Sequence, residues 1–204
     1  PVVLTGSQIP LSETRNDAIT NLLGALVVAG HFDIPEVCIY FGDVLLRGNR
    51  ARKISAVGFD AFDAPNDEPL ITFGVDVVLR ANAIRPAPTR PFKLREIGSC
   101  DVAALRMFPG LSASALQHML EPPLAGLVLE TYGAGNIPLT RPDLLDVLRA
   151  AVERGVVIVN CTQCLHGSVS AAYESGTLLK EMGIVSGMDL TPEAALTKLA
   201  WSLT

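Results

Sequence analysis

Glu36-Val-Cys-Ile-Tyr-Phe-Gly-Asp-Val-Leu-Leu-Arg-Gly-Asn-Arg-Ala-Arg-Lys53 is the stretch that decides the fold of this chain. Its first part, from Val37 to Phe41, is an unbroken apolar run, long enough for a β-strand and too short for a typical helix. A strand that is apolar on both faces is typical of a parallel sheet covered by helices. We therefore expect an α/β fold, with this strand inside a parallel sheet.

The same stretch becomes strongly basic after the apolar run, with four cations between Arg47 and Lys53. Ligands of open α/β sheets bind outside the carboxyl ends of strands, so this loop is a candidate site. Two interpretations stay open: a solvated basic loop, or a loop whose Lys53 faces a cleft and moves a proton or orients a nucleophile. Lysine suits the second role because burial and neighbouring cations lower its pKa, whereas Arg50 and Arg52 cannot deprotonate.

The composition indicates a globular chain with one or two hydrophobic cores. Of its 204 residues, 49% are hydrophobic and 18% are charged, and the net charge is −5. The acidic balance and the few aromatic residues argue against a nucleic-acid partner. No apolar run approaches the roughly 20 residues of a membrane-spanning helix, so we expect no membrane partner either.

The four cysteines are Cys38, Cys100, Cys161 and Cys164. Cys38 and Cys161 lie in apolar runs, where cysteine is a small buried hydrophobe, and this usage is typical of a reducing cytoplasm. Cys161-Thr-Gln-Cys164 matches C-x-x-C, but no second ligand pair follows at the spacing of a zinc site. We interpret both as structural thiols and expect no metal and no cofactor.

Strand and helix patterns alternate along the first part of the chain. Pro1 to Thr5 has the pattern of a buried strand, and because an interior strand is an odd beginning, we expect sheet partners upstream of Pro1. Apolar residues at helical spacing predict a helix from Asp17 to Ala29, with Asn16 as its N-cap. Three prolines between residues 86 and 91 predict an extended linker over 81–91, between domains at 1–80 and 92–204.

The alternation continues after this linker, which predicts a second, smaller α/β domain. Ser112 is a candidate cap for a helix reaching Leu120, and Thr191 for a final helix. An amphipathic helix is predicted from residue 142 to residue 154. Gly133-Ala-Gly135-Asn136 lacks the third glycine of a dinucleotide site, so it is either a strand-end turn or a turn whose Asn136 binds a small ligand.

Five stretches, taken in order, carry a resemblance to one family. They are Pro1-Val-Val-Leu-Thr-Gly-Ser-Gln-Ile-Pro10, Leu46-Arg-Gly-Asn-Arg-Ala-Arg-Lys53, Gly58-Phe-Asp-Ala-Phe62, Tyr132-Gly-Ala-Gly-Asn136 and Val159-Asn-Cys-Thr-Gln-Cys164. Together they resemble the type I, cytosolic L-asparaginases, among which the mammalian-type branch is the most similar. The resemblance extends from Pro1 to Thr204.

The resemblance implies hydrolysis of L-asparagine to L-aspartate and ammonia through a threonine acyl-enzyme in the cytoplasm. It places the assisting catalytic lysine at Lys53 and sets Ser7 against the amino-acid end of the substrate. It also implies that Asn136 and Tyr173 bind substrate in the neighbouring subunit of a homodimer, and that two dimers form a homotetramer. Spacing alone gives Tyr173 only the role of an aromatic anchor.

Two departures from the family pattern qualify this expectation. The chain contains neither Thr-Gly-Gly-Thr nor Gly-Thr-Asp-Thr, so we expect the catalytic threonines upstream of Pro1 and no turnover by the 204 residues alone. Glu130 stands where allosteric bacterial members carry an arginine, which argues against their effector site, although Cys164 matches a residue near it. A non-catalytic amino-acid-binding module and an amidotransferase-type amidase subunit are the alternative functions.

Overall fold

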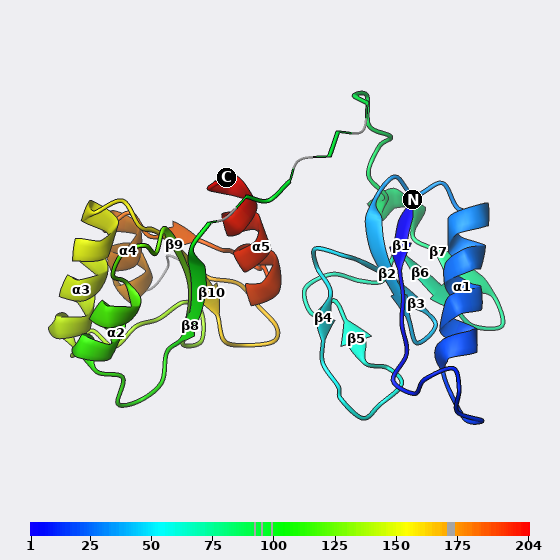
Figure 1. Ribbon diagram of the computed structural model, residues 1–204, viewed down its shortest axis with the longest axis horizontal. Coiled ribbons are helices and arrows are strands. Elements are labelled where there is room, and N and C mark those ends of the chain that lie inside the picture. Colours follow the sequence, from blue (N-terminus) through cyan, green and yellow to red (C-terminus); the bar gives the residue numbers. More distant parts are fainter. Residues whose placement is uncertain (92, 95, 99, 171–173) are drawn as a thin grey trace. The chain divides into compact units, whose positions relative to one another are not determined.

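The computed structural model describes residues 1–91, 93–94, 96–98, 100–170 and 174–204. The chain divides into two compact units, Pro1–Lys93 and Leu94–Thr204, and both contain helices packed on sheets (Figure 1). The predicted α/β class is thereby confirmed, while the domain limits set at residues 80 and 92 stay a prediction. None of the helices within the described ranges has the length and apolar character that crossing a membrane demands.

The first unit, over the described residues 1–91, is built on a five-stranded sheet in the order β1-β2-β3-β6-β7. Its strands are β1 (Val2–Leu4), β2 (Val37–Phe41), β3 (Val44–Arg47), β6 (Ile71–Phe73) and β7 (Val77–Leu79). A separate antiparallel pair and two helical segments complete it: β4 (Arg52–Lys53), β5 (Phe62–Asp63), α1 (Ala18–His31) and the 3₁₀ turn η1 (Ala81–Ala83).

Helix α1 packs on β1 and β2 and closes the core of this unit (Figure 1). Asn16, the predicted cap, accepts hydrogen bonds through Oδ1 from the backbone N–H groups of Ala18 (3.1 Å) and Ile19 (3.3 Å). The N-cap position is nevertheless held by Asp17 and not by Asn16, so the helix begins one residue later than predicted, and it ends two residues later, at His31. Val28 on this helix and Tyr40 on β2 are almost completely buried.

The sequence predicted that the strand after residue 36 lies inside a parallel sheet. In the structure this strand, β2, has one parallel and one antiparallel neighbour. Gly42 and Asp43 both have positive φ (56° and 63°), as a two-residue hairpin turn requires, and the chain returns as β3. Strand β2 is therefore parallel to β1 and antiparallel to β3, with Cys38 opposite Arg47. The basic loop consequently begins beside the amino end of β2, where Gly48 N–H donates to the Val37 carbonyl (2.9 Å). Its expected position at the carboxyl end of β2 was wrong.

Strand β1 also differs from its prediction as a buried strand. It lies at the edge of the sheet, with β2 on one side, and Val2 and Leu4 are 50% and 55% exposed. The apolar pattern correctly predicted a parallel strand, but it could not predict how many neighbours cover that strand in this chain.

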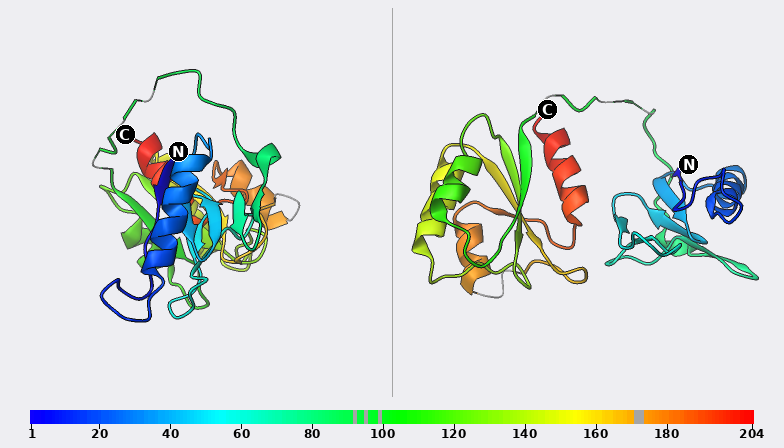
Figure 2. Two further views of the ribbon diagram at one scale, coloured as in Figure 1. Left: turned by 90° about the vertical axis from the view of Figure 1, so that its right-hand side faces the viewer. Right: turned by 60° about the horizontal axis from the view of Figure 1, so that its bottom comes forward.

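The second unit contains, within its described residues, a four-stranded parallel sheet in the order β11-β10-β9-β8. Its strands are β8 (Val102–Arg106), β9 (Gly126–Thr131), β10 (Val157–Thr162) and β11 (Val185–Ser186). Its helices are α2 (Ala113–Met119), α3 (Pro142–Glu153), α4 (Glu174–Glu181) and α5 (Pro192–Ser202). Helices α2, α3 and α4 cover one face of the sheet and α5 the other, as the right-hand view of Figure 2 shows.

Helices α2 and α5 start directly after the residues that were predicted to cap them, Ser112 and Thr191. Ser112 Oγ accepts from the N–H of Ala115 (3.1 Å), and Thr191 Oγ1 accepts from the N–H of Ala194 (3.2 Å). Each bond satisfies a backbone donor that the first helical turn leaves unpaired. No sequence pattern was taken to predict α4.

Candidate active site

A pocket of about 260 Å³ opens at the carboxyl end of β1. Thr5, Ser7 and Lys53 provide its polar groups, and three apolar side chains form its walls: Ile39, Phe41 and Phe62. The pocket therefore gathers residues from three separate parts of the first unit. Of the four predicted site residues, it brings together Ser7 and Lys53.

The loop that carries Ser7 is held by the first turns of α1. The Asp17 carboxylate accepts hydrogen bonds from the backbone N–H groups of Gln8 (2.9 and 3.1 Å) and Ile9 (2.9 Å). Asn21 lies one helical turn further on and donates to the Gly6 carbonyl (2.9 Å). These bonds fix the backbone on both sides of Ser7, which leaves its side chain at the pocket wall.

Asp17 is charged in this arrangement. Burial by itself raises the pKa of its carboxyl, but the N–H donors of Ile9 and Gln8 and the amide of Asn21 outweigh burial and lower that pKa. Asn21 also accepts from the N–H of Gly42 (3.1 Å) through its Oδ1. The start of α1 thereby joins the Ser7 loop to the β2–β3 turn, a role that no sequence pattern indicated.

Lys53 reaches the pocket from β4. Pairing of β4 with β5 places Lys53 opposite Phe62, and its Nζ lies 5.7 Å from the centre of that ring. Nζ donates to Oε1 of Gln8 (2.8 Å). Of the two interpretations of the basic loop, the position of Lys53 at the pocket fits the second, although β4 brings this lysine to the end of β1 and not of β2; its catalytic role stays a prediction.

Asn136 lies in the second unit, on the turn that follows β9. Gly133 and Gly135 have positive φ (49° and 102°), which glycine adopts most readily, and the N–H of Asn136 donates to the Tyr132 carbonyl (2.7 Å). Buried Asn160 donates through Nδ2 to the Gly135 carbonyl (3.1 Å). The Asn136 side chain is half-buried on a turn of fixed shape.

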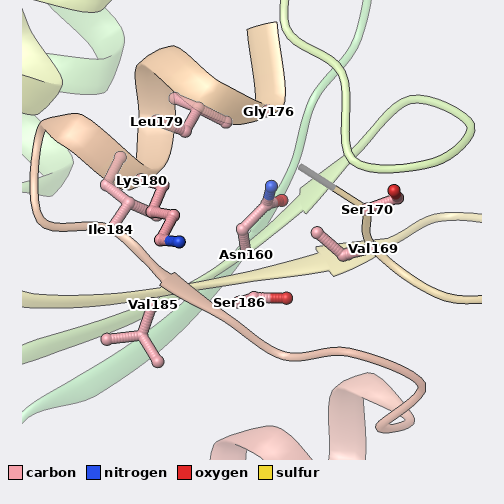
Figure 3. Close-up of a pocket in the computed structure, with 9 residues that line it drawn as sticks. All are labelled: Asn160, Val169, Ser170, Gly176, Leu179, Lys180, Ile184, Val185 and Ser186. Atoms are coloured by element: carbon pink, nitrogen blue, oxygen red, sulfur yellow. The ribbon is translucent and has the colours of Figure 1, made fainter. Parts of the chain in front are cut away.

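The predicted ligand-binding residue Tyr173 lies outside the described residues. A second pocket, of about 320 Å³, lies near the end of β10 (Figure 3). Asn160, Lys180 and Ser186 contribute polar groups to it. Asn160 is already engaged at both ends of its amide, since its Oδ1 also accepts from Thr131 Oγ1 (2.7 Å). The pocket with Ser7 and Lys53 is therefore the better candidate for chemistry.

The two cysteines of the C-x-x-C pair differ in burial, and Cys161 lacks the environment of a reactive thiol. Burial, with the negative charge of Glu130, raises the pKa of the Cys161 thiol to about 11, whereas a reactive cysteine needs a lowered pKa. Cys164 is exposed. Within the described ranges, no group of three or more metal-binding side chains comes together.

Comparisons with known proteins agree on one family. The protein-family model of the asparaginase N-terminal domain matches residues 1–85. The family model of the glutaminase/asparaginase C-terminal domain matches residues 101–204. A 60 kDa lysophospholipase of Mus musculus is 48% identical to this chain over its whole length, and the chain covers 36% of that protein. An L-asparaginase of Dirofilaria immitis is 44% identical, and the chain covers 35% of it.

A solved structure, L-asparaginase I of Vibrio cholerae, matches the whole chain with a TM-score of 0.91 and 44% identity. The chain covers 61% of that structure and about a third of the two curated relatives. Both halves of the chain thus match the two domains of one enzyme family in the expected order. The chain belongs to the asparaginase family, with type I enzymes among its structural relatives.

Proposed function

We propose that the protein to which this chain belongs hydrolyses L-asparagine to L-aspartate and ammonia. The observation that carries the proposal is the pocket at the end of β1, where Ser7 and Lys53 line the same cavity. Membership of the asparaginase family supports the reaction class, and a relative at 44% identity bears the name L-asparaginase.

Lys53 is the proposed proton carrier. Its Nζ is held by a neutral amide oxygen, so its charge is not neutralised by that partner. In its neutral amine form, a lysine hydrogen-bonded to a threonine hydroxyl can accept the hydroxyl proton as the oxygen attacks; the ammonium so formed can then return a proton to the leaving nitrogen. This role requires a side chain that can lose and regain a proton, which arginine at the same position cannot do.

The proposed nucleophile is a threonine in a segment that precedes Pro1. Its Oγ bonds to the side-chain amide carbon of asparagine, the C–N bond breaks, and ammonia leaves with the added proton. Water then attacks the ester, which releases aspartate and restores the threonine hydroxyl. The support for this step is the family resemblance, since the relatives extend well beyond the part that this chain covers.

Substrate binding is proposed for Ser7, Asn136 and Tyr173. Ser7 would face the amino-acid end of asparagine from the end of β1. Asn136 and Tyr173 would reach the active site of a neighbouring subunit in a homodimer, with two dimers forming a tetramer. We further propose that the protein is cytoplasmic, a location that its four unpaired thiols fit. The proposed domains are 1–80 and 92–204, joined by 81–91.

The test is ammonia release from L-asparagine by the full-length protein, compared with Lys53→Ala. We expect kcat to fall by at least about a hundredfold, the range of a general acid–base group. Lys198→Ala is the matched control, because Lys198 is an exposed lysine on α5. Full turnover by Lys53→Ala would refute the lysine assignment.

The same preparations separate the other possible reactions and the subunit arrangement. Fatty-acid release from a lysophospholipid without ammonia release from asparagine would refute the asparaginase proposal. Mixing Lys53→Ala subunits with Asn136→Ala subunits should restore activity, since a mixed dimer contains one intact shared site. Recovery of no activity from correctly assembled mixtures would contradict the shared site.

A further inference from the structure

Gln8 makes contacts with three different segments of the first unit. Its Oε1 accepts from Lys53 Nζ (2.8 Å), and its Nε2 donates to the carbonyls of Gly58 (3.0 Å) and Ser55 (3.3 Å). Its backbone N–H is held by the carboxylate of Asp17. The side chain is therefore fixed at its base by one segment and at its end by another.

These partners determine which way the Gln8 amide faces. Carbonyl oxygens only accept hydrogen bonds, and an ammonium group only donates them. An amide turned over would set its oxygen against two carbonyl oxygens and its NH₂ group against the charged Nζ. Only the observed orientation satisfies all the partners, so Oε1 is directed at Lys53 by the backbone of residues 55–58.

Lys53 requires such an acceptor. Lysine has a flexible four-carbon stem and β4 is only two residues long, so strand pairing fixes the backbone but not the ammonium group. Among the described residues, the hydrogen-bond acceptor found for Nζ is Gln8, and the other close group is the face of the Phe62 ring. The Lys53 ammonium is exposed apart from these contacts.

We propose that Gln8 is the positioning residue for Lys53: its clamped amide holds the ammonium group at the end of β1, beside Ser7. The neutral acceptor orders the lysine without the full negative charge of a carboxylate, which would bind its proton more strongly. The catalytic consequence rests on the asparaginase function proposed above, whereas the positioning itself does not.

The variants are Gln8→Met, which removes both the acceptor and the clamp, and Gln8→Glu, which sets a carboxylate beside Lys53. Both keep the backbone N–H that Asp17 binds. Gln163→Met is the matched control: Gln163 Nε2 also donates to two backbone carbonyls, those of Met107 (2.6 Å) and Glu130 (2.9 Å), but in the second unit. All are measured in the full-length protein, with the thermal midpoint as the check on folding.

The activity-independent measurement is the pKa of Lys53, followed by NMR through its ¹³Cε shift. We expect Gln8→Glu to raise this pKa by about one unit, because an adjacent opposite charge favours the ammonium form. Gln163→Met should leave it unchanged. A Lys53 pKa that is the same in wild type and Gln8→Glu would overturn the proposal, whether or not the protein hydrolyses asparagine.

The kinetic measurement separates positioning from folding. Gln8→Met should lower kcat for asparagine about tenfold with KM within about twofold, since misplacing a catalytic group costs rate more than binding. Gln8→Glu should shift the acid side of the pH–rate profile to higher pH, because Lys53 must be unprotonated to accept the threonine proton. If the pKa shifts but wild type releases no ammonia, the positioning stands and the proposed function fails. Wild-type kcat in folded Gln8→Met would overturn the positioning role.

Discussion

Arg47→Met should destabilise the first unit strongly, because Arg47 is the centre of a largely buried ion cluster. Its guanidinium donates to Glu36 (2.5 and 3.2 Å), to Asp67 (2.7 Å) and to the Ala83 carbonyl (2.8 Å). The side chains of Arg47 and Glu36 are only 14% and 6% exposed. Removing one partner of a buried pair leaves an unpaired buried charge, which costs about 3–5 kcal/mol.

We take the lower end, about 3 kcal/mol, because Glu36 keeps a hydrogen bond from the N–H of Arg85 (3.1 Å). The assay is hydrogen exchange at the buried amides of β3 and at Leu70, whose N–H donates to the Leu45 carbonyl (2.7 Å). Exchange of these amides through unfolding of the unit should accelerate roughly 150-fold at pH 7. Arg149→Met is the control, since its pair with Asp146 is exposed and should contribute less than about 0.5 kcal/mol.

The pH dependence identifies the cause. Burial raises the pKa of Glu36, but its hydrogen bonds from Arg47 and Arg85, with their charges, lower it below the ordinary value overall. A lowered pKa contributes stability above the ordinary pKa, and this stability is lost as the pH falls through the lowered one. Without Arg47, burial dominates and Glu36 can take up a proton, so the penalty should shrink to about half by pH 4.5. A penalty equal to that of Arg149→Met, or one independent of pH, would refute the reasoning.

Two further predictions concern packing and thiol reactivity. Gly24→Ala should destabilise the first unit by about 1–3 kcal/mol, because the new Cβ would stand 2.1 Å from the buried Tyr40 ring, and either the ring or α1 must shift. Urea unfolding measures the effect against the exposed control Gly30→Ala, and equal stabilities of the two variants would contradict it. Iodoacetamide at pH 8 should label exposed Cys164 well before Cys38 and Cys161, because burial raises the pKa of the Cys38 and Cys161 thiols to about 11. Mass spectrometry follows the labelling, and equal labelling rates for the three cysteines would contradict this prediction.

The sequence was sufficient where the signal is local. Ser112 and Thr191 predicted helix starts because a capping hydroxyl bonds to a backbone N–H only three residues away. The Gly42–Asp43 turn was missed although its signal is also local: a glycine–aspartate pair between two apolar runs is a hairpin pattern. Reading Glu36–Lys53 as one strand and one loop placed the basic segment at the wrong end of β2.

The candidate site also has a part that the sequence predicted and a part that only the structure showed. Sequence motifs identified Ser7 and Lys53 and the family to which the chain belongs. They could not predict that Lys53 Nζ meets Gln8, 45 positions away, or that Asp17 and Asn21 hold the Ser7 loop. A cap or a turn is determined by neighbouring residues, which the sequence shows directly. The pocket depends on pairing of β4 with β5 and on packing of α1 against β1, and only the tertiary structure decides which distant segments meet.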